Sequence, residues 1–356
     1  MAESERVRDH RIYPEKHPDE AGAEIPRMKL EPSTLERILL VRLSALGDCL
    51  AAVPVFHALR KRFPKAHIAW VVQDNFAPLL GQLPGLDEII VFPRRRWLNS
   101  RSRGLPWGEA RQFIRHLRLR RFRLAVDVQS NTKSSLIAFL SRAPVRIGHG
   151  GEEARELSAW FNTLRIPPAP GEHHIVQRNL GLLRPLGIEP AEPDFTLPPD
   201  PYARRRMLHW LHSQGLREQA YDLLVPFCGQ PEKEWPPAHF TALAGRLAQA
   251  GRPTVMLLGP GKEQETRDLL PAPSFPLVIL GPQTNIPEMA ELVRMARVCA
   301  GGDTGPVQIA GALGVPTICL FGPTDPRRSR PWSNSCPMPL DSPPEVVFEA
   351  IRRIRE

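Results

Sequence analysis

The stretch VCAGGDTGPVQIAGALGVPTICLF, residues 298–321, contains a strand, a turn, a helix and a second strand in immediate succession. Val298–Gly301 is a short apolar run of the kind that forms a buried parallel strand. A glycine-rich turn follows, and Gly305–Leu313 then has the apolar content and length of a helix. The next apolar run, Thr317–Phe321, follows a Gly-Val-Pro turn. This order predicts a βαβ unit with two parallel strands.

The same alternation extends outward from this unit over most of the chain. Strands are predicted at residues 37–42, 67–72, 88–92, 124–128, 145–147, 221–226, 254–258, 277–280, 298–301 and 317–321. Helices are predicted at residues 49–62, 107–119, 134–140, 174–186, 237–250, 262–270, 286–295, 305–313 and 343–355. Strands that alternate with helices indicate doubly wound α/β domains with parallel sheets.

The chain divides into two such domains. Residues 1–33 have the charged, proline-punctuated composition of a flexible leader, and residues 34–187 form a first Rossmann-like domain. Five prolines between Gly187 and Arg204 mark a linker over residues 188–204. A second Rossmann-like domain covers residues 205–340, and a final helix within 341–356 is expected to pack back on the first domain. The predicted architecture is two domains that face a central cleft.

Composition and charge limit the cellular compartments and the classes of binding partner that the protein can have. A net charge of +9 and a pI near 9.7 indicate a negatively charged partner, either a nucleic acid, an anionic lipid surface or a phosphorylated substrate. No run reaches the ~18 apolar residues of a membrane-spanning helix, and the polar N-terminus does not resemble a signal peptide. The five cysteines form no C-x-x-C pair, which predicts reduced and mostly buried thiols. We therefore expect a cytoplasmic protein.

Ligands of open α/β sheets bind beyond the carboxyl ends of the strands, and three unusual segments fall there. The first is Ser44–Asp48, in which Gly47 lets the backbone approach a ligand and Asp48 could accept a proton from a hydroxyl. Asp48 could equally be the cap of the following helix, since aspartate is a favoured capping residue.

The other two segments have features of phosphate sites. Lys233, in the loop Cys228–Pro236, could place a point charge on a diphosphate, or could simply be a solvated lysine. In residues 300–306, glycines flank Asp303-Thr304 at a helix N-terminus, an arrangement that suits an anion or a purely structural turn. Glu263 follows a weaker glycine loop and could accept ribose hydroxyls. Neither a Walker A motif nor a dinucleotide-binding G-x-G-x-x-G fingerprint is present.

Together these segments resemble glycosyltransferase family 9, the ADP-heptose:lipopolysaccharide heptosyltransferases. The matching motifs are RILLVRLSALGDCLAAVP at 37–54, KEWP at 233–236 and GDTGPVQIAGALGVPTICLFGPTDP at 302–326. A fourth element matches as Asp127, Gln129, Lys133 and Ser134. The resemblance runs from about residue 36 to the C-terminus.

The resemblance implies a GT-B fold, with the acceptor in the N-terminal domain and the nucleotide sugar in the C-terminal one. It also implies an inverting transfer that needs neither metal nor cofactor, with ADP-heptose as donor and the Kdo–lipid A region of lipopolysaccharide as acceptor. Asp48 would be the general base, and Lys233 would stabilise the leaving diphosphate together with the amides of Thr304 and Gly305.

The family resemblance also implies which residues bind the two substrates. The donor would be bound by Gly229, Glu263 at the ribose, Thr284 at the adenine, Asp303, Thr304 and Gly305. The acceptor would be bound by Ser44, Gly47, Gln129, Lys133, Arg94, Arg95 and Arg96. No metal ligands are expected.

Residues 94–123 hold eleven arginines and one acid, Glu109, with Trp97 and Trp107 interleaved. This stretch is either a solvated basic face or the border of an anionic, lipid-linked acceptor site. In the second case we expect salt-sensitive peripheral contact with the anionic inner membrane surface. The high pI also suits a nucleic-acid-binding protein, but the sequence contains no nucleic-acid recognition motif. We therefore expect the protein not to bind nucleic acid.

Three departures from the family pattern bear on the substrate. Gln308 and Pro306 stand where the family often has a histidine and a leucine, and Gln129-Ser130-Asn131 replaces the more usual Q-G-L. Another nucleotide sugar or another glycan acceptor is therefore the alternative within the family. A non-catalytic member is disfavoured because Asp48, Lys233 and Asp303 are all present.

Overall fold

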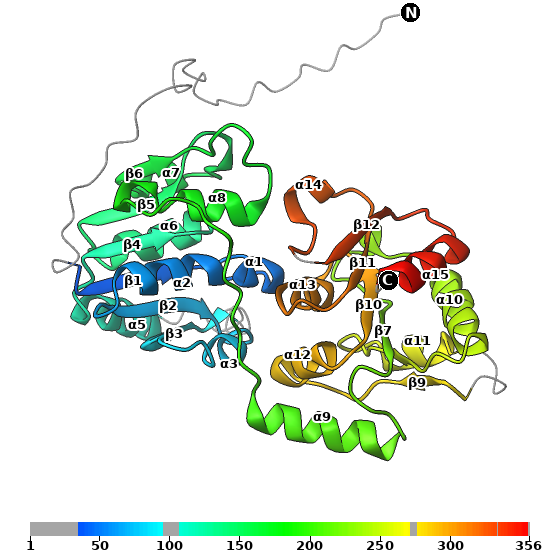
Figure 1. The fold of residues 1–356 in the computed structure, drawn as a ribbon. Helices are drawn as coiled ribbons and strands as arrows, with labels where there is room; N and C mark the ends of the chain where they lie inside the picture. Colours follow the sequence, from blue (N-terminus) through cyan, green and yellow to red (C-terminus); the bar gives the residue numbers. More distant parts are fainter. Residues whose placement is uncertain (1–34, 95–106, 271–275, 333, 355–356) are drawn as a thin grey trace, which may run out of the picture.

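A computed structural model describes residues 35–94, 107–270, 276–332 and 334–354 of the 356-residue chain. They form two α/β domains joined by an extended segment (Figure 1). Both sheets are entirely parallel, as the alternation of strands and helices predicts. In the described residues, no helix has the length and apolar content needed to cross a bilayer.

The first domain is built on a six-stranded sheet. Its strands are β1 (Arg37–Val41), β2 (His67–Gln73), β3 (Glu88–Phe92), β4 (Leu124–Asp127), β5 (Val145–His149) and β6 (Leu164–Ile166). Their order in the sheet is β3-β2-β1-β4-β5-β6. The apolar run of β1 lies in the centre, where Leu40 is opposite Trp70 on one side and Val126 on the other. A central parallel strand is buried on both faces, which explains why β1 is apolar at successive positions.

Helices cover both faces of this sheet. They are α1 (Leu46–Leu50), α2 (Val53–Arg62), α3 (Ala77–Leu80), α5 (Trp107–Leu119), α6 (Thr132–Leu140), α7 (Ser158–Phe161) and α8 (Ile175–Gly181), with the 3-10 helices η3 (Gly151–Glu153) and η4 (Arg184–Leu186). On one face, Phe56 of α2 packs with Leu40, and α2 contacts α8. On the other face, Leu117 of α5 and Ile137 of α6 pack with Leu39, and α6 also contacts α7.

The second domain repeats this plan. Its strands are β7 (Asp222–Val225), β8 (Thr254–Met256), β9 (Val278–Leu280), β10 (Val298–Gly302), β11 (Thr317–Phe321) and β12 (Ser335–Pro339), in the order β12-β11-β10-β7-β8-β9. Its helices are α9 (Pro201–Ser213), α10 (Pro237–Gln249), α11 (Glu263–Asp268), α12 (Ile286–Arg294), α13 (Gly305–Ala312), α14 (Pro326–Ser329) and α15 (Pro344–Arg353), with the 3-10 helix η5 (Pro231–Lys233). The predicted βαβ unit is β10-α13-β11.

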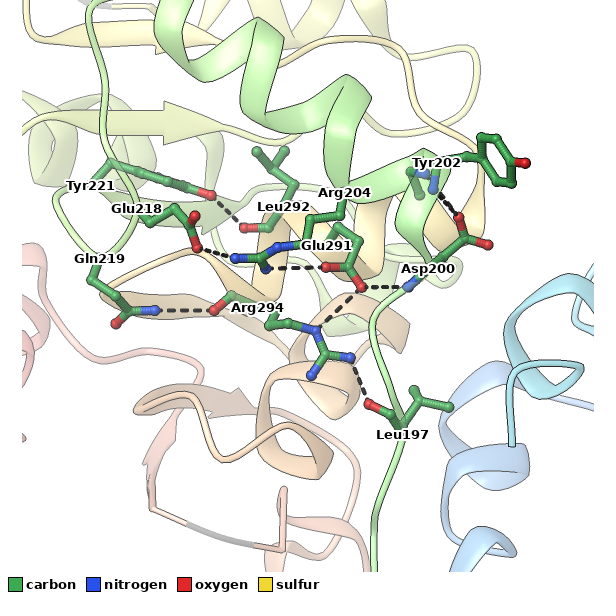
Figure 2. A network of polar contacts seen from close by, with 11 residues as sticks. Leu197, Asp200, Tyr202, Arg204, Glu218, Gln219, Tyr221, Glu291, Leu292 and Arg294 are labelled. Atoms are coloured by element: carbon green, nitrogen blue, oxygen red, sulfur yellow. Dashed lines mark hydrogen bonds and ion pairs between the residues drawn. The ribbon is translucent and has the colours of Figure 1, made fainter. Parts of the chain in front are cut away.

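The linker ends in a buried polar network on the second domain (Figure 2). Glu291 of α12, only 2 % exposed, accepts the backbone N–H of Asp200 at 3.2 Å and is paired with Arg204 and Arg294. Arg294 also donates to the Leu197 carbonyl at 2.7 Å. The extended segment is therefore tied to α12 before it enters α9. Since α9 begins at Pro201, the linker ends four residues before the predicted boundary at 204.

Several predicted elements need correction. The final helix, α15, packs on α10 and β11 and not on the first domain, because Val347 and Ile351 are buried in the second domain's core. The predicted helix 49–62 is divided into α1 and α2, and the helix expected to reach 186 ends at Gly181.

Two edge strands, β6 and β12, were not predicted. The strand β6 has only three residues, and β12 (SCPMP) contains two prolines, which are found in sheets mainly on edge strands.

The prediction for the cysteines is confirmed, since all five are free thiols and three are buried.

Candidate active site

A cleft of about 1340 Å³ lies between the two domains. Its walls come from segments that follow the strands at their carboxyl ends, including residues 44–48 after β1 and residues 303–306 after β10. This is the position that the rule for open α/β sheets predicts. The predicted site residues that line it are Ser44, Gly47, Asp48, Gln129, Gly229, Lys233, Asp303, Thr304 and Gly305.

Asp48 lies in the first turn of α1, where its carboxylate bonds the backbone at the start of the helix and also lines the cleft. Its Oδ2 accepts the backbone N–H of Ala45 at 3.2 Å, so the carboxylate does cap the helix, which begins at Leu46 rather than at Cys49. The side chain is nevertheless 45 % exposed and lines the cleft. Both contacts of Asp48 in the described residues use Oδ2, which leaves Oδ1 available to a hydroxyl.

Arg42 fixes this carboxylate and was not predicted to do so. One guanidinium nitrogen lies 2.5 Å from Asp48 Oδ2, and the other donates to the Val128 carbonyl at 3.1 Å. The arginine is 7 % exposed, so its charge is held in a largely desolvated position. The neighbouring thiol of Cys49 is no competitor as a base, because burial raises its pKa to about 12.

On the opposite wall, Lys233 and Asp303 form an ion pair. The Lys233 ammonium lies 3.1 Å from Asp303 Oδ2, and the two side chains are 19 % and 10 % exposed. Asp303 Oδ1 accepts from Gln308 Nε2 at 2.9 Å, and the same amide donates to the Ser329 carbonyl at 2.6 Å. Lys233 ends η5, which is anchored by the buried Trp235 through a bond from its indole N–H to the Ser342 carbonyl.

The helix α13 begins beside this ion pair. Thr304 is the N-cap residue in an extended conformation, and its side chain makes no capping bond. Pro306 in the first turn has no N–H, so Thr304 and Gly305 carry the backbone N–H groups immediately before it at the start of the helix. Gly302 is required here, since a Cβ would lie 2.4 Å from the Lys233 carbonyl oxygen. The close approach of β10 to η5 therefore places Lys233 next to the helix N-terminus.

The predicted donor residues divide between two hollows. Glu263 and Thr284 line a smaller side hollow of about 450 Å³, which shares Leu258, Gly259 and Pro260 with the main cleft. Glu263 is held there by Arg267 and Gln283, each at 3.1 Å. A nucleoside that reached from the main cleft into the side hollow would pass over this shared loop.

The predicted acceptor residues are only partly brought together. Gln129 uses its Oε1 to accept the Leu43 N–H at 2.8 Å, which ties β4 to the end of β1. Lys133 is exposed on α6 and does not line the cleft, because the helix begins at Thr132 and turns this side chain to solvent. Arg94 is exposed and outside the cleft lining, while Arg95 and Arg96 lie outside the described residues.

An ion pair that joins the two domains was also missed. Arg328 of α14 donates two bonds to Glu153 of η3, at 2.6 and 2.8 Å, and Arg178 contacts the same carboxylate. Hydrogen bonding from Arg328 lowers the pKa of Glu153 to about 2. Buried His149 nearby contacts Asn179, and burial lowers the pKa of this imidazole to about 4.

A histidine provides a second contact between the domains. His174 accepts the Val176 N–H at its Nδ1 and donates from Nε2 to the Arg330 carbonyl at 2.8 Å. Its ring also packs edge-on against Trp332, with centroids 4.8 Å apart. No local signal in the sequence indicates these pairings, because the partners lie more than 150 residues apart along the chain.

Comparisons with known proteins agree with this geometry. The profile of glycosyltransferase family 9 (heptosyltransferase) matches residues 110–340. Lipopolysaccharide heptosyltransferase 1 of Pseudomonas aeruginosa is 31 % identical over 301 residues, which are 82 % of this chain and 79 % of that protein.

Solved structures of the family have the same fold. The family 9 glycosyltransferase of Veillonella parvula superposes with a TM-score of 0.76 at 19 % identity, over 90 % of this chain and 97 % of its own. The E. coli heptosyltransferase WaaC with ADP-2-deoxy-2-fluoro heptose superposes with a TM-score of 0.71 at 25 % identity, over 89 % and 99 %. The chain belongs to glycosyltransferase family 9, the heptosyltransferases, and is a glycosyltransferase with the GT-B fold.

Proposed function

We propose that this protein transfers heptose from ADP-heptose to the inner core of lipopolysaccharide, in the Kdo–lipid A region, with inversion at the anomeric carbon. The observation that carries the proposal is that Asp48 and the Lys233–Asp303 pair line opposite walls of one interdomain cleft. The names of the P. aeruginosa relative and of the E. coli complex support the donor and the acceptor class.

In the acceptor half of the reaction, Asp48 accepts the proton of the attacking hydroxyl. The hydroxyl oxygen forms a bond to the anomeric carbon from the face opposite the diphosphate, and the bond from that carbon to the diphosphate oxygen breaks. Arg42 acts as a positioning residue, because its 2.5 Å contact holds Oδ2 while Oδ1 faces the substrate. A positioned general base of this kind contributes about 10²- to 10⁴-fold.

In the donor half, the leaving ADP gains negative charge that needs stabilisation. The Lys233 ammonium and the amides of Thr304 and Gly305 would supply it, and such preorganised donors are worth about 3–4 kcal/mol each. Asp303 keeps the ammonium next to the helix N-terminus before the donor arrives. We propose on this basis that the transfer requires no metal ion.

The nucleoside would extend from the cleft into the side hollow. Glu263 would accept ribose hydroxyls and Thr284 would line the adenine site, since both line this hollow. Gly229 has open space around its Cα and lets the loop after β7 approach the donor. The acceptor would bind on the opposite side, along Ser44, Gly47 and Gln129.

A second candidate is a family 9 transferase with another nucleotide sugar or glycan acceptor. The observation that favours it is Gln308, which bonds both Asp303 and the Ser329 carbonyl where the family often has a histidine. In either case we propose a cytoplasmic enzyme that works on an anionic, lipid-linked acceptor at the inner membrane surface.

Mass spectrometry of transfer from ADP-heptose to Kdo₂–lipid A tests the proposal, with wild type beside Asp48→Asn. The asparagine keeps the size and capping oxygen of Asp48 but removes its basicity. We expect a heptose-sized mass gain in wild type and a rate at least about 100-fold lower in the variant. Asp341→Asn is the matched control, because Asp341 is exposed and outside the cleft lining.

Each outcome has a distinct meaning. Transfer that persists in Asp48→Asn would contradict the assignment of the base while keeping the activity. Folded wild type that transfers nothing from ADP-heptose, but does so from another nucleotide sugar, would favour the second candidate.

A further inference from the structure

Exposed apolar side chains gather on one side of the first domain. Of the nine large apolar side chains that are exposed in the described residues, six belong to the layer formed by α5, α6 and α7. They are Trp107, Leu119, Leu136, Phe139, Leu157 and Trp160. Single exposed apolar residues are ordinary, whereas a cluster of them indicates an interaction surface.

Four of the six lie on α6 or at α7, two helices that pack against each other, and we call them the α6–α7 patch: Leu136, Phe139, Leu157 and Trp160. Residues 132, 136 and 139 share one face of α6. At one end of this face, Thr132 Oγ1 accepts the Leu157 N–H at 3.2 Å, and at the other the Phe139 and Phe161 rings are 5.6 Å apart. The face of α6 therefore runs along α7, and Trp160 projects from it with 83 % of its surface exposed.

Cations surround this patch. The helix α5 exposes Arg111, Arg115 and Arg118, and Lys133 and Arg142 are exposed at the two ends of α6. Arg118 donates to the Leu140 carbonyl at 3.2 Å, which brings the basic face of α5 to the end of α6.

Few acidic groups offset this charge. Glu109 is the single acid within α5, α6 and α7, and Glu156, just before α7, bonds the N–H of Thr132. An apolar centre with a cationic border is complementary to an anionic bilayer.

The patch adjoins the active-site cleft. Asn131, the residue before α6, and Arg155, two residues before Leu157, both line the cleft. Ser44, Gly47 and Gln129 line the same cleft from the same domain. A bilayer in contact with the patch would therefore lie beside the acceptor side of the cleft.

We propose that the α6–α7 patch docks the enzyme on an anionic membrane, with Trp160 and Leu157 inserted at the boundary between headgroups and acyl chains. The arginines of α5 and Arg142 bind the headgroup phosphates. The biological role of this docking rests on the proposed function, in which the acceptor is linked to a lipid. The membrane contact itself is argued from the apolar and charged residues of this surface alone. A second copy of the chain is a poorer partner, because a two-fold contact would bring like-charged borders together.

Co-sedimentation with lipid vesicles tests the docking without donor or acceptor. We expect wild type to bind vesicles of phosphatidylcholine with 30 % phosphatidylglycerol, and to bind pure phosphatidylcholine much more weakly. Trp160→Ser should lower the association constant about tenfold, since burial of a large apolar side chain is lost. Tyr202→Ser is the matched control, because Tyr202 is an 82 % exposed aromatic residue on α9 of the other domain.

A second measurement reports on insertion itself. Brominated lipids should quench part of the tryptophan emission of wild type, and Trp160→Phe should retain binding while losing most of that quenching. The proposal would be overturned if wild type failed to bind anionic vesicles, or if Trp160→Ser bound them as tightly as wild type. A dimer in analytical ultracentrifugation that Trp160→Ser dissociates, while vesicle binding stays unchanged, would also overturn it.

The docking and the proposed activity can fail separately. With a de-acylated, soluble acceptor, Trp160→Ser should turn over at the wild-type rate, because Trp160 is outside the cleft lining. With the acceptor embedded in anionic vesicles, the variant should be slower. Vesicle binding without any transfer would preserve the docking surface and remove the proposed reaction.

Discussion

At the scale of single residues, Gln308 links the donor side of the cleft to the loop on the acceptor side. Its amide nitrogen carries two protons and bonds both Asp303 Oδ1 at 2.9 Å and the Ser329 carbonyl at 2.6 Å. Its Cγ also packs where Gly47 leaves room, since a Cβ there would lie 2.9 Å away. Gln308 therefore positions the acid that holds Lys233 and at the same time contacts the loop that carries Asp48.

Gln308→Met should impair transfer without unfolding the protein. Methionine has a similar size but cannot donate to Asp303, and a hydrogen bond to a charged group is worth about 1.5–3 kcal/mol. We expect kcat/KM to fall about 10- to 100-fold. Gln308→His should retain more activity, because a neutral imidazole donates to one of the two acceptors. Steady-state kinetics with ADP-heptose measures both.

Gln249→Met is the control for this series, because Gln249 is exposed at the end of α10. If Gln308→Met had the same kcat/KM as wild type, the contact with Lys233 alone would be enough to hold Asp303 in position.

At the scale of secondary-structure elements, the network around Glu291 joins the linker, α9 and α12 (Figure 2). We expect Glu291→Gln to lower the free energy of unfolding by about 3–5 kcal/mol, since it leaves Arg204 and Arg294 without their buried carboxylate. Thermal unfolding should show a clear fall in Tm. Glu345→Gln is the control, because its pair with Arg246 is exposed to solvent and adds little to stability. Equal Tm changes in both variants would contradict this role of Glu291.

At the scale of the whole molecule, the Glu153–Arg328 pair closes one side of the cleft. The pKa of Glu153 falls from 4.5 to about 2 on folding, so its contribution to stability is present above pH 4.5 and is lost as the pH falls towards 2. The Tm difference between wild type and Glu153→Gln should therefore be largest near pH 7 and shrink below pH 4.5. Calorimetry across this range measures it, and a difference that grows on acidification would contradict the assignment.

The same pair should affect the spacing of the domains. Without the Glu153 carboxylate, Arg328 and Arg178 repel each other across the interface, and we expect a larger radius of gyration by X-ray scattering. Arg327→Gln is the control, because Arg327 is 77 % exposed and pairs with Asp325, the N-cap residue of its own helix.

Local patterns in the sequence were sufficient for most of the fold. The apolar runs of β1 and β10, the glycine-rich turn before α13 and the prolines of the linker each have a physical reason within a few residues. The motifs at Asp48, Lys233 and Asp303 follow strands at their carboxyl ends, so a shared cleft followed from the topology. The family could therefore be identified from the sequence alone.

Tertiary structure decided what depends on contacts between distant segments. Three features could not be predicted from local sequence: α15 covers the second domain, Lys133 faces solvent and Arg328 reaches Glu153. Each depends on which side of a helix packs against the rest of the protein. The same holds for Arg42, which resembles any arginine after a strand until the fold places Asp48 beside it. Sequence periodicity specifies an element and its buried face, whereas the pairing of charges across 175 residues depends on how whole domains pack.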